Sequence, residues 1–316
     1  MKLEELRSMF QQIGVPQRPE DQVLMQRMLL HAGIEPRNVH QEMEMSSRFV
    51  DTYPDVSFSN AAISLHSHSF YEILYCCNTC GVEYLVEVTR YQLRKGDIVL
   101  LPPGVSHRPL LPENMTEPYR RYVLWLSVEY VAALERISAI PFRKDGIRLL
   151  RTAGTRWEYL GELFKLGVME YAAQEPGWEE AICGSTTFLL AHLCRAVMDQ
   201  SAAPLPPEKA ELLDQVMAYV EQHLAERITL AEVARQFYVS ESTITQAFRK
   251  RMDVSFYRCV TQRRLIAAKA LIERGILLEA VAEQVGFSDY STFFRAFKQE
   301  YGTSPRQYRK RQNAQE

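Results

Sequence analysis

The spacing of apolar residues along the chain changes twice. At first it has the period of helices, in segments 3–13 and 21–32 that Gly and Pro residues separate. From about residue 47 to residue 130 it has the period of strands, with short apolar runs between turns rich in Gly, Pro and Asn. These runs predict strands at 61–67, 71–76, 83–88, 98–101 and 119–128. After residue 131 the helical period returns.

This succession of patterns predicts an α+β protein. Short strands with frequent turns are typical of a small β-barrel or jelly roll, and we expect helical extensions on both sides of it. Pro204, Pro206 and Pro207 stop any helix there and indicate a linker. We therefore expect a helical extension at 1–45, a barrel domain at 46–135, a helical region at 136–200, a linker at 201–207 and an all-α domain at 208–316.

One pattern occurs twice in the all-α domain. Between 233–241 and 281–289, seven of the nine residue pairs match in identity or type. Each copy indicates a short helix, a polar turn and a second helix, which Ser240 or Ser288 should cap. The second turn carries one extra residue. The buried face of the second helix should carry Ile244 and Phe248 in the first copy, and Phe293 and Phe297 in the second.

The second helix of each copy presents polar and basic residues on its opposite face. Two short helices joined by a tight turn, with such a face outward, form a unit that enters the major groove of DNA. Residues 226–311 carry 16 Lys and Arg against 9 Asp and Glu, although the whole chain has a net charge of −2. This basic module favours phosphate binding at one end of the chain. The candidate DNA contacts are Ser242, Thr245, Gln246, Arg249, Lys250, Tyr290, Ser291, Phe294, Arg295, Lys298 and Arg306.

The order of these segments resembles the DNA-binding domain of the AraC/XylS family of bacterial transcription regulators. The resemblance rests on segments 240–250, 264–272, 281–298 and 301–309. It implies two helix-turn-helix units joined by a long helix, here expected at 257–273, with double-stranded DNA and RNA polymerase as partners. It also implies an activator more often than a repressor. Gln246 stands where the family often has Arg, so a relative's operator does not transfer to this chain.

The barrel region resembles the two cupin motifs, and cupin domains often serve AraC-type regulators as sensors. The residues that carry this resemblance are His66, His68, Glu72 and His107. If residues 66–72 form a strand, positions 66, 68 and 72 share one face. The Pro and Gly turn before His107 would bring that residue to the same place. We therefore expect these four residues, with Tyr84, to bind an effector inside the barrel.

Converging imidazoles and a carboxylate need a partner, because a buried polar group without one is costly. We expect a small polar organic effector, such as a sugar or a carboxylate, since Tyr71, Tyr84 and Tyr122 offer hydroxyl and stacking groups. The second hypothesis is a transition metal such as Zn, Fe, Mn or Ni, held by the four motif residues. The third is that these residues bond to one another through water.

Two long amphipathic segments, at 156–174 and 178–198, lie between the barrel and the linker. They resemble the dimerisation helices of the family, so we expect a homodimer, formed through exposed residues such as Leu163 and Leu190. The alternative is that the two helices only close the core of the barrel.

Composition points to a cytoplasmic protein. No apolar run approaches the roughly 18–20 residues of a membrane span, and the first residues lack the apolar core of a signal peptide. The six Cys residues show no secreted disulfide pattern, so we expect reduced thiols. Cys77 and Cys80 form a lone CxxC, without the second pair that a zinc ribbon needs.

The sequence as a whole predicts a sequence-specific DNA-binding transcription regulator that is not an enzyme. One alternative is a metal-binding cupin sensor, or a metal-dependent cupin enzyme, fused to a DNA-binding module. Another is a protein–protein adaptor that uses the helical region and no longer binds DNA.

Overall fold

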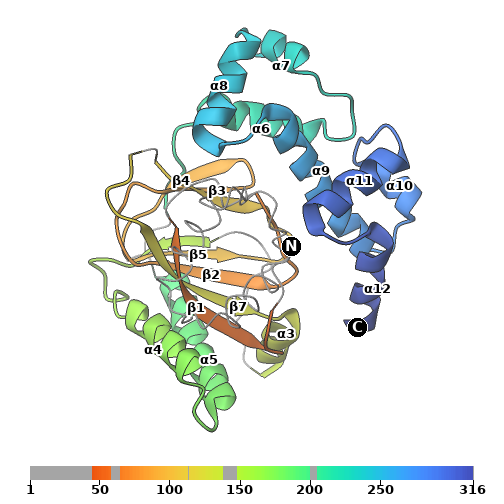
Figure 1. Cartoon of the computed structure of the whole chain (residues 1–316). Coiled ribbons are helices and arrows are strands. Elements are labelled where there is room, and N and C mark those ends of the chain that lie inside the picture. The colour runs from red at the N-terminus through yellow and green to blue at the C-terminus, as the bar shows by residue number, and fades with distance from the viewer. Residues whose placement is uncertain (1–44, 58–64, 113, 138–147, 200–204, 316) are drawn as a thin grey trace, which may run out of the picture.

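The computed structural model describes residues 45–57, 65–112, 114–137, 148–199 and 205–315. The helices expected at 3–13 and 21–32 lie outside the described residues, as does most of the strand expected at 61–67. The described chain has a β-rich part followed by a helical part, so the α+β prediction is confirmed (Figure 1).

Two antiparallel sheets form the β-rich part. The larger has the strand order β1-β7-β2-β5-β8 and the smaller has the order β4-β3-β6. The strands are β1 (Val50–Ser57), β2 (Tyr71–Cys76), β3 (Glu83–Val86), β4 (Thr89–Gln92), β5 (Asp97–Leu101), β6 (His107–Leu110), β7 (Tyr119–Leu126) and β8 (Arg148–Arg151). The strand expected at 71–76 is confirmed, and β3, β5 and β7 lie within two residues of their expected bounds. The strands β1, β4, β6 and β8 were not expected.

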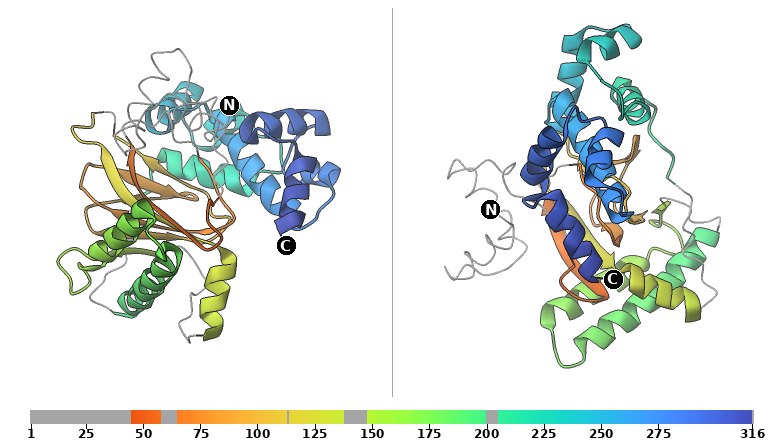
Figure 2. Two further views of the ribbon diagram at one scale, coloured as in Figure 1. Left: turned by 60° about the horizontal axis from the view of Figure 1, so that its bottom comes forward. Right: turned by 90° about the vertical axis from the view of Figure 1, so that its right-hand side faces the viewer.

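Each sheet has one face toward the other and one face outward. On β7, Val123 and Trp125 point inward and join a core with Tyr84 of the smaller sheet. Leu124 and Leu126 point outward, into a second core with the helices α4 (Leu160–Ala173) and α5 (Trp178–Met198). Each fully buried Leu or Phe contributes roughly 1.5–3 kcal/mol, so this second core fastens both helices to the larger sheet (Figures 1 and 2).

The contact between α4 and the sheet is close. A Cβ atom at Gly161 would lie 2.4 Å from the Tyr75 hydroxyl oxygen, so a larger residue would have to displace the Tyr75 ring where α4 meets β2. The expectation that Leu163 and Leu190 are exposed is wrong. Leu190 is buried and Leu163 half-buried, because both pack into the core beneath the two helices. By length and composition α5 alone among the described helices could cross a membrane, but its inner face belongs to this core.

The helical part contains the two expected helix pairs. The remaining described helices are α3 (Val128–Ile137), α6 (Leu212–Gln222), α7 (Leu230–Gln236), α8 (Glu241–Met252), α9 (Phe256–Glu273), α10 (Leu278–Gln284), α11 (Tyr290–Tyr301) and α12 (Pro305–Gln315). The pair α7 and α8 and the pair α10 and α11 lie at opposite ends of α9 (Figures 1 and 2). The long helix expected at 257–273 is thus confirmed, with one more residue at its start.

The N-terminal caps of α8 and α11 differ. Ser240 caps α8 as expected, with its hydroxyl oxygen accepting a hydrogen bond from the Thr243 N–H at 3.1 Å. The cap of α11 is Asp289, whose carboxylate accepts a 2.7 Å bond from the Thr292 N–H, and not Ser288 as expected. The extra residue in the second turn moves the cap one position along the chain, and Ser288 donates its hydroxyl to Asp289.

The two halves of the chain are in contact. Residues 205–207 are the described part of the expected linker, and Leu205 packs into the core between the sheets. Its N–H donates a 3.0 Å hydrogen bond to the Leu149 carbonyl. Leu85 and Leu110 of the smaller sheet share a third core with residues of α6 and α8, including Met217 and Phe248. The helices α6 and α8 therefore lie against the smaller sheet (Figure 1).

Candidate functional site

The residues of the cupin-like motifs are brought together by two loops. Residue 66 is not part of a strand, but its backbone exchanges hydrogen bonds with that of His107, at 3.2 and 2.9 Å. Gly104 forms a tight turn, with φ of 82°, and its backbone N–H donates a 2.8 Å hydrogen bond to the His68 carbonyl. These bonds hold the segment before β2 against the start of β6, although the single strand expected across residues 66–72 is not formed.

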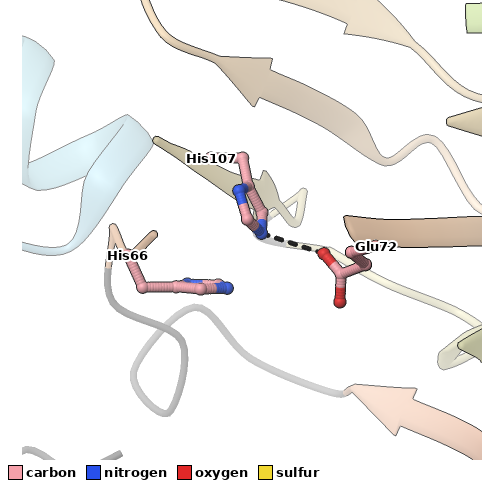
Figure 3. Close-up of side chains that lie close together, drawn as sticks. All are labelled: His66, Glu72 and His107. Carbon is pink, nitrogen blue, oxygen red and sulfur yellow. Dashed lines mark ion pairs between the residues drawn. The ribbon is translucent and has the colours of Figure 1, made fainter. Parts of the chain in front are cut away.

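The side chains of these residues converge inside the barrel. One nitrogen of His66, one of His107 and one carboxylate oxygen of Glu72 lie within 4.8 Å of one another (Figure 3). The Nε2 atom of His107 is 2.9 Å from Oε2 of Glu72, and that of His68 is 3.6 Å from the same oxygen. All but His66 are buried.

Backbone contacts fix which ring nitrogens carry hydrogen. Nδ1 of His68 is 2.8 Å from the Phe70 carbonyl oxygen, and Nδ1 of His107 is 2.9 Å from that of Val105. A carbonyl oxygen only accepts, so each Nδ1 must donate, and the Nε2 atom of a neutral ring then carries a lone pair. Neither Nε2 atom, nor the Glu72 oxygen that both approach, has a hydrogen-bond partner of good geometry among the described residues. With neutral rings, acceptor atoms thus face one another, whereas a ring that also carries hydrogen at Nε2 would donate it to Glu72.

The Glu72 carboxylate is ionised. Burial alone would raise the pKa of Glu72, but hydrogen bonds and charge from the nearby His107 and His68 rings, when their Nε2 atoms carry hydrogen, outweigh it and hold the pKa well below its ordinary value. Burial is also the main reason why the pKa of His68 is lowered, despite the neighbouring carboxylate. The second Glu72 oxygen accepts a 2.8 Å hydrogen bond from the Trp125 indole N–H. An ionised carboxylate in this place would accept hydrogen bonds or a cation.

Other interior residues extend this polar region. The Tyr84 ring stacks on His107, with ring centroids 6.2 Å apart. Arg121 donates a 2.9 Å hydrogen bond to the Ser57 hydroxyl and pairs with Asp55, while the buried Tyr119 hydroxyl has no partner among the described residues. Sequence reasoning missed Tyr119 and Arg121, although the alternation along β7 places both on the face of Trp125.

The other two tyrosines expected at the site lie elsewhere. Tyr71 and Tyr122 belong to the outer core beneath α4 and α5, so they cannot reach the motif residues from inside the barrel. The lone CxxC shows no reactive thiol. Burial raises the pKa of Cys77 to about 11 and also raises the pKa of Cys80, so both thiols stay protonated near neutral pH.

A second candidate site is the outer face of α8 and α11. The four apolar residues expected on the inner faces of these helices are fully buried: Ile244, Phe248, Phe293 and Phe297. Eight of the candidate DNA contacts are exposed, namely Ser242, Gln246, Arg249, Lys250, Ser291, Arg295, Lys298 and Arg306, while Thr245, Tyr290 and Phe294 are half-buried. The helix caps leave both N-termini at the ends of the two turns, as a major-groove unit requires.

Residues on either side of His107 reach the helical part. The buried guanidinium of Arg108 donates a 2.9 Å hydrogen bond to the carbonyl of Met252, the last residue of α8. On the other side, the Ser106 hydroxyl accepts a bond from Arg263 of α9, which also donates a 2.7 Å bond to Glu221. These contacts join the cluster inside the barrel to α8 of the first helix-turn-helix pair and to the connecting helix α9.

Both parts of the chain match known families. An AraC-like ligand-binding domain matches residues 52–156, and a helix-turn-helix domain matches residues 233–311. The transcriptional activator RhaS of Salmonella arizonae is 25% identical over 260 residues, which cover 80% of this chain and 90% of RhaS. The uncharacterised HTH-type regulator YfiF of Bacillus subtilis is 26% identical over 259 residues, which cover 78% of each chain.

Solved structures are similar over one or both parts. The C-terminal domain of AraT, a response regulator of Geobacillus stearothermophilus, is 27% identical and covers 33% of this chain and 87% of its own, with a TM-score of 0.32. An apo structure of ToxT from Vibrio cholerae is 15% identical and covers 84% of this chain and 98% of its own, with a TM-score of 0.36. The domain matches and the curated relatives, which are transcription regulators and not enzymes, show that this chain belongs to the AraC family of DNA-binding transcription regulators, with a ligand-binding domain before its helix-turn-helix domain.

Proposed function

We propose that this regulator is a cytoplasmic activator that responds to a small polar effector bound by His66, His68, Glu72, His107 and Tyr84. The observation that carries the proposal is the convergence of acceptor atoms without hydrogen-bond partners inside the barrel. Buried polar atoms of this kind are satisfied when a ligand supplies what the protein lacks. Activation and contact with RNA polymerase are inferred from the family, in which RhaS is named an activator.

The chemistry of the cluster limits the effector. With His68 and His107 neutral, their Nε2 atoms and the charged Glu72 all accept hydrogen bonds, so the bound molecule must donate them. Hydroxyl groups of a sugar or polyol, or an ammonium group, meet this condition. The sequence left a carboxylate effector open as well, but a carboxylate would face the negative charge of Glu72 and is therefore disfavoured here. The Tyr84 ring offers a flat surface beside these acceptor atoms.

A transition metal is the second candidate, favoured by one observation. Metal-bound imidazoles usually donate their other ring N–H to a carbonyl or carboxylate, and the Nδ1 atoms of His68 and His107 lie against carbonyl oxygens in this way. The metal would be held by His66, Glu72 and His107, with His68 beside it, and would supply positive charge to the three acceptors. Elemental analysis of the purified full chain distinguishes the two ligands directly.

The effector signal would pass along β6. His107 lies between Ser106, which bonds to Arg263 of α9, and Arg108, which bonds to Met252 of α8. An effector that displaces His107 therefore weakens or strengthens both contacts together. Because these contacts hold α8 and α9, the change shifts the population of DNA-binding arrangements toward one state.

The regulator acts as a homodimer in this proposal. The outer faces of α4 and α5 expose Leu166, Met169 and Phe188, each by more than half, although Leu163 and Leu190 are covered. Exposed large apolar residues on neighbouring helices favour a partner surface. A second copy of the chain is the partner that the family resemblance implies for these helices.

The function is tested by finding the DNA and the effector together. The purified full chain is used to select duplexes from a random library, with and without extract of effector-rich cells. Thermal shift assays then compare polyols, amino sugars and amines with carboxylates of similar size. We expect selected duplexes to share a sequence, and only the hydrogen-bond-donating compounds to raise the melting temperature. A regulator that selects no sequence, or that only carboxylates stabilise, contradicts the proposal.

A further inference from the structure

The two helix-turn-helix turns have the same backbone but differ at one residue. The same three backbone hydrogen bonds close both turns, and Tyr238 in the first stands where Gly286 stands in the second. Both residues have a left-handed backbone, with φ of 55° at Tyr238 and 83° at Gly286. Glycine adopts this conformation readily, whereas a bulky side chain does so at a cost.

The surroundings of the two residues explain the glycine but not the tyrosine. A Cβ atom at Gly286 would lie 2.2 Å from the Leu224 carbonyl oxygen, so no side chain fits there. Tyr238 meets no such barrier, and its side chain is 96% exposed, more than any other large apolar residue in the described part of the chain. Stability alone would favour Gly or Asn at position 238, because neither strain nor exposure is offset by burial.

The adjacent residue, Phe237, is the one that anchors the turn to the core. Phe237 packs on the Tyr219 ring, with centroids 5.9 Å apart, and joins the core of the first unit. The Tyr238 ring has no comparable partner among the described residues, so it contributes nothing to that core. A strained and exposed aromatic side chain points to a partner outside the chain.

The position of Tyr238 indicates which partner. It lies two residues before Ser240, the cap of α8, and the N-terminal residues of such a helix approach the base edges. The turn before them therefore runs beside the sugar–phosphate backbone at the edge of the groove. The exposed Arg235 precedes it, and the helical domain as a whole is basic.

We propose that Tyr238 contacts the DNA backbone at the first half-site. Its ring packs on a deoxyribose and its hydroxyl donates a hydrogen bond to a phosphate oxygen. Such a contact fixes the register of the unit without reading a base. Gly286 has no side chain to make it, so only the first unit has this anchor.

The test uses the full chain and two duplexes of equal length, one recovered by selection and one of random sequence. Tyr238→Gly should raise the melting temperature by a few degrees and weaken binding to both duplexes equally, by about three- to tenfold. Tyr238→Asn, which tolerates the left-handed backbone, should behave in the same way. Tyr238→Phe should lose only the part due to the hydroxyl. None should change the salt dependence of binding, because tyrosine carries no charge that displaces counterions.

Val128→Ala is the matched control, since Val128 is exposed on the ligand-binding domain. Its affinity for both duplexes should equal that of the unchanged protein. Equal affinity of Tyr238→Gly and the unchanged protein overturns the proposal. A loss confined to the selected duplex also overturns it, in favour of base reading. If DNA affinity is retained but transcription by RNA polymerase falls, Tyr238 contacts the polymerase and the proposal is wrong.

Discussion

The guanidinium of Arg108 donates a 2.9 Å hydrogen bond to the backbone carbonyl of Met252. This bond joins the residue after His107 to the last residue of α8, the second helix of the first helix-turn-helix pair. Burial lowers the pKa of Arg108 to about 10, so a charged group is held away from water at the boundary of the two domains. A charge in this place is costly, and packing alone would not require it.

We predict that Arg108→Met uncouples DNA binding from the effector. Methionine fills similar space without the hydrogen bond, so the free energy of unfolding should change little while the constraint on α8 is lost. Operator affinity, measured with and without effector, should become the same. Arg48→Met, which removes an exposed ion pair with Glu129, is the control and should keep the response. An intact response in Arg108→Met would show that the signal takes another path.

Asp289 gives a prediction about pH. Its bonds to Thr292, first of all to the backbone N–H, lower its pKa below the ordinary value of 3.8. A carboxyl group with a depressed folded pKa adds stability that is present above pH 3.8 and lost as the pH falls through the folded pKa. Asp289→Asn keeps the cap but removes this titration.

Unfolding of the full chain should therefore depend less on pH below 3.8 in Asp289→Asn than in the unchanged protein. At neutral pH, Asp289→Ala should destabilise α11 more than Ser288→Ala, because Asp289 is the cap. Denaturant titrations at a series of pH values measure both effects. Equal losses in the two alanine variants would mean that Ser288 shares the capping role.

Arg295 is predicted to read a base. It is exposed on α11, and its bonds to the Ser291 carbonyl and the Thr292 hydroxyl, at 3.4 and 3.5 Å, are long and lie within its own helix. Both can be exchanged for a contact in a groove. A bidentate contact to guanine would contribute about 1–3 kcal/mol of discrimination. Arg295→Ala should therefore lose affinity for one operator sequence more than for its variants. Gln246 on α8 is the corresponding candidate for adenine.

Lys250, Lys298 and Arg306 are predicted to contact phosphate instead. Their replacement by Ala should weaken binding to all duplexes alike and flatten the salt dependence, by about one unit of slope for each residue. Fluorescence anisotropy across a salt series, on operator variants, separates the two classes. A uniform loss in Arg295→Ala would move that residue into the phosphate class.

Self-association is predicted to depend on the outer face of α4 and α5. A charge at Leu166 or Phe188, which are 57% and 53% exposed, should disrupt a dimer without disturbing the core. Sedimentation of the full chain should show a dimer for the unchanged protein and a monomer for Phe188→Glu. Val128→Glu, on a different helix, should remain a dimer. A monomeric unchanged protein at high micromolar concentration would remove the proposal.

The sequence predicted the helical part well, because the buried face of a helix is defined by the spacing of residues that are close in the chain. The four-residue spacing of Ile244 and Phe248 defines a buried face without any knowledge of the rest of the chain. Strand β6 was missed for the opposite reason. Its first residues, His107 and Arg108, are polar but buried. The spacing of apolar residues along a sequence cannot distinguish a buried polar residue from an exposed one.

Tertiary packing also determines which apolar residues of a helix are covered, and the sequence alone does not show this. Both Leu166 and Leu190 are apolar residues on amphipathic helices, but only the position of the larger sheet determines which one is covered. The convergence of His107 with Glu72 followed from motif spacing. The donor and acceptor roles of the His68 and His107 ring nitrogens depend instead on the carbonyl beside each Nδ1. That detail changed the expected effector from any polar molecule to one that donates hydrogen bonds.

Glu72→Gln tests directly whether the effector donates hydrogen bonds to the cluster. Gln has the shape of Glu but no charge, and it turns one acceptor into a donor. An effector that donates hydroxyl or ammonium hydrogens should bind about tenfold or more weakly to this variant, because charge-assisted hydrogen bonds are the stronger kind. Calorimetry of the full chain measures the dissociation constant. Tyr122→Phe, on the outer face of the sheet, is the control and should bind as the unchanged protein does.

His107→Ala complements this variant. It removes an acceptor and should abolish the effector response, while binding to operator DNA without effector persists. Tighter effector binding by Glu72→Gln would mean that the effector is an anion and that the acceptor argument fails. If the unchanged protein contains near-stoichiometric zinc, iron, manganese or nickel, and His107→Ala contains none, the ligand of the cluster is a metal. The organic effector would then have to be sought elsewhere in the barrel, beginning with Tyr119 and Arg121.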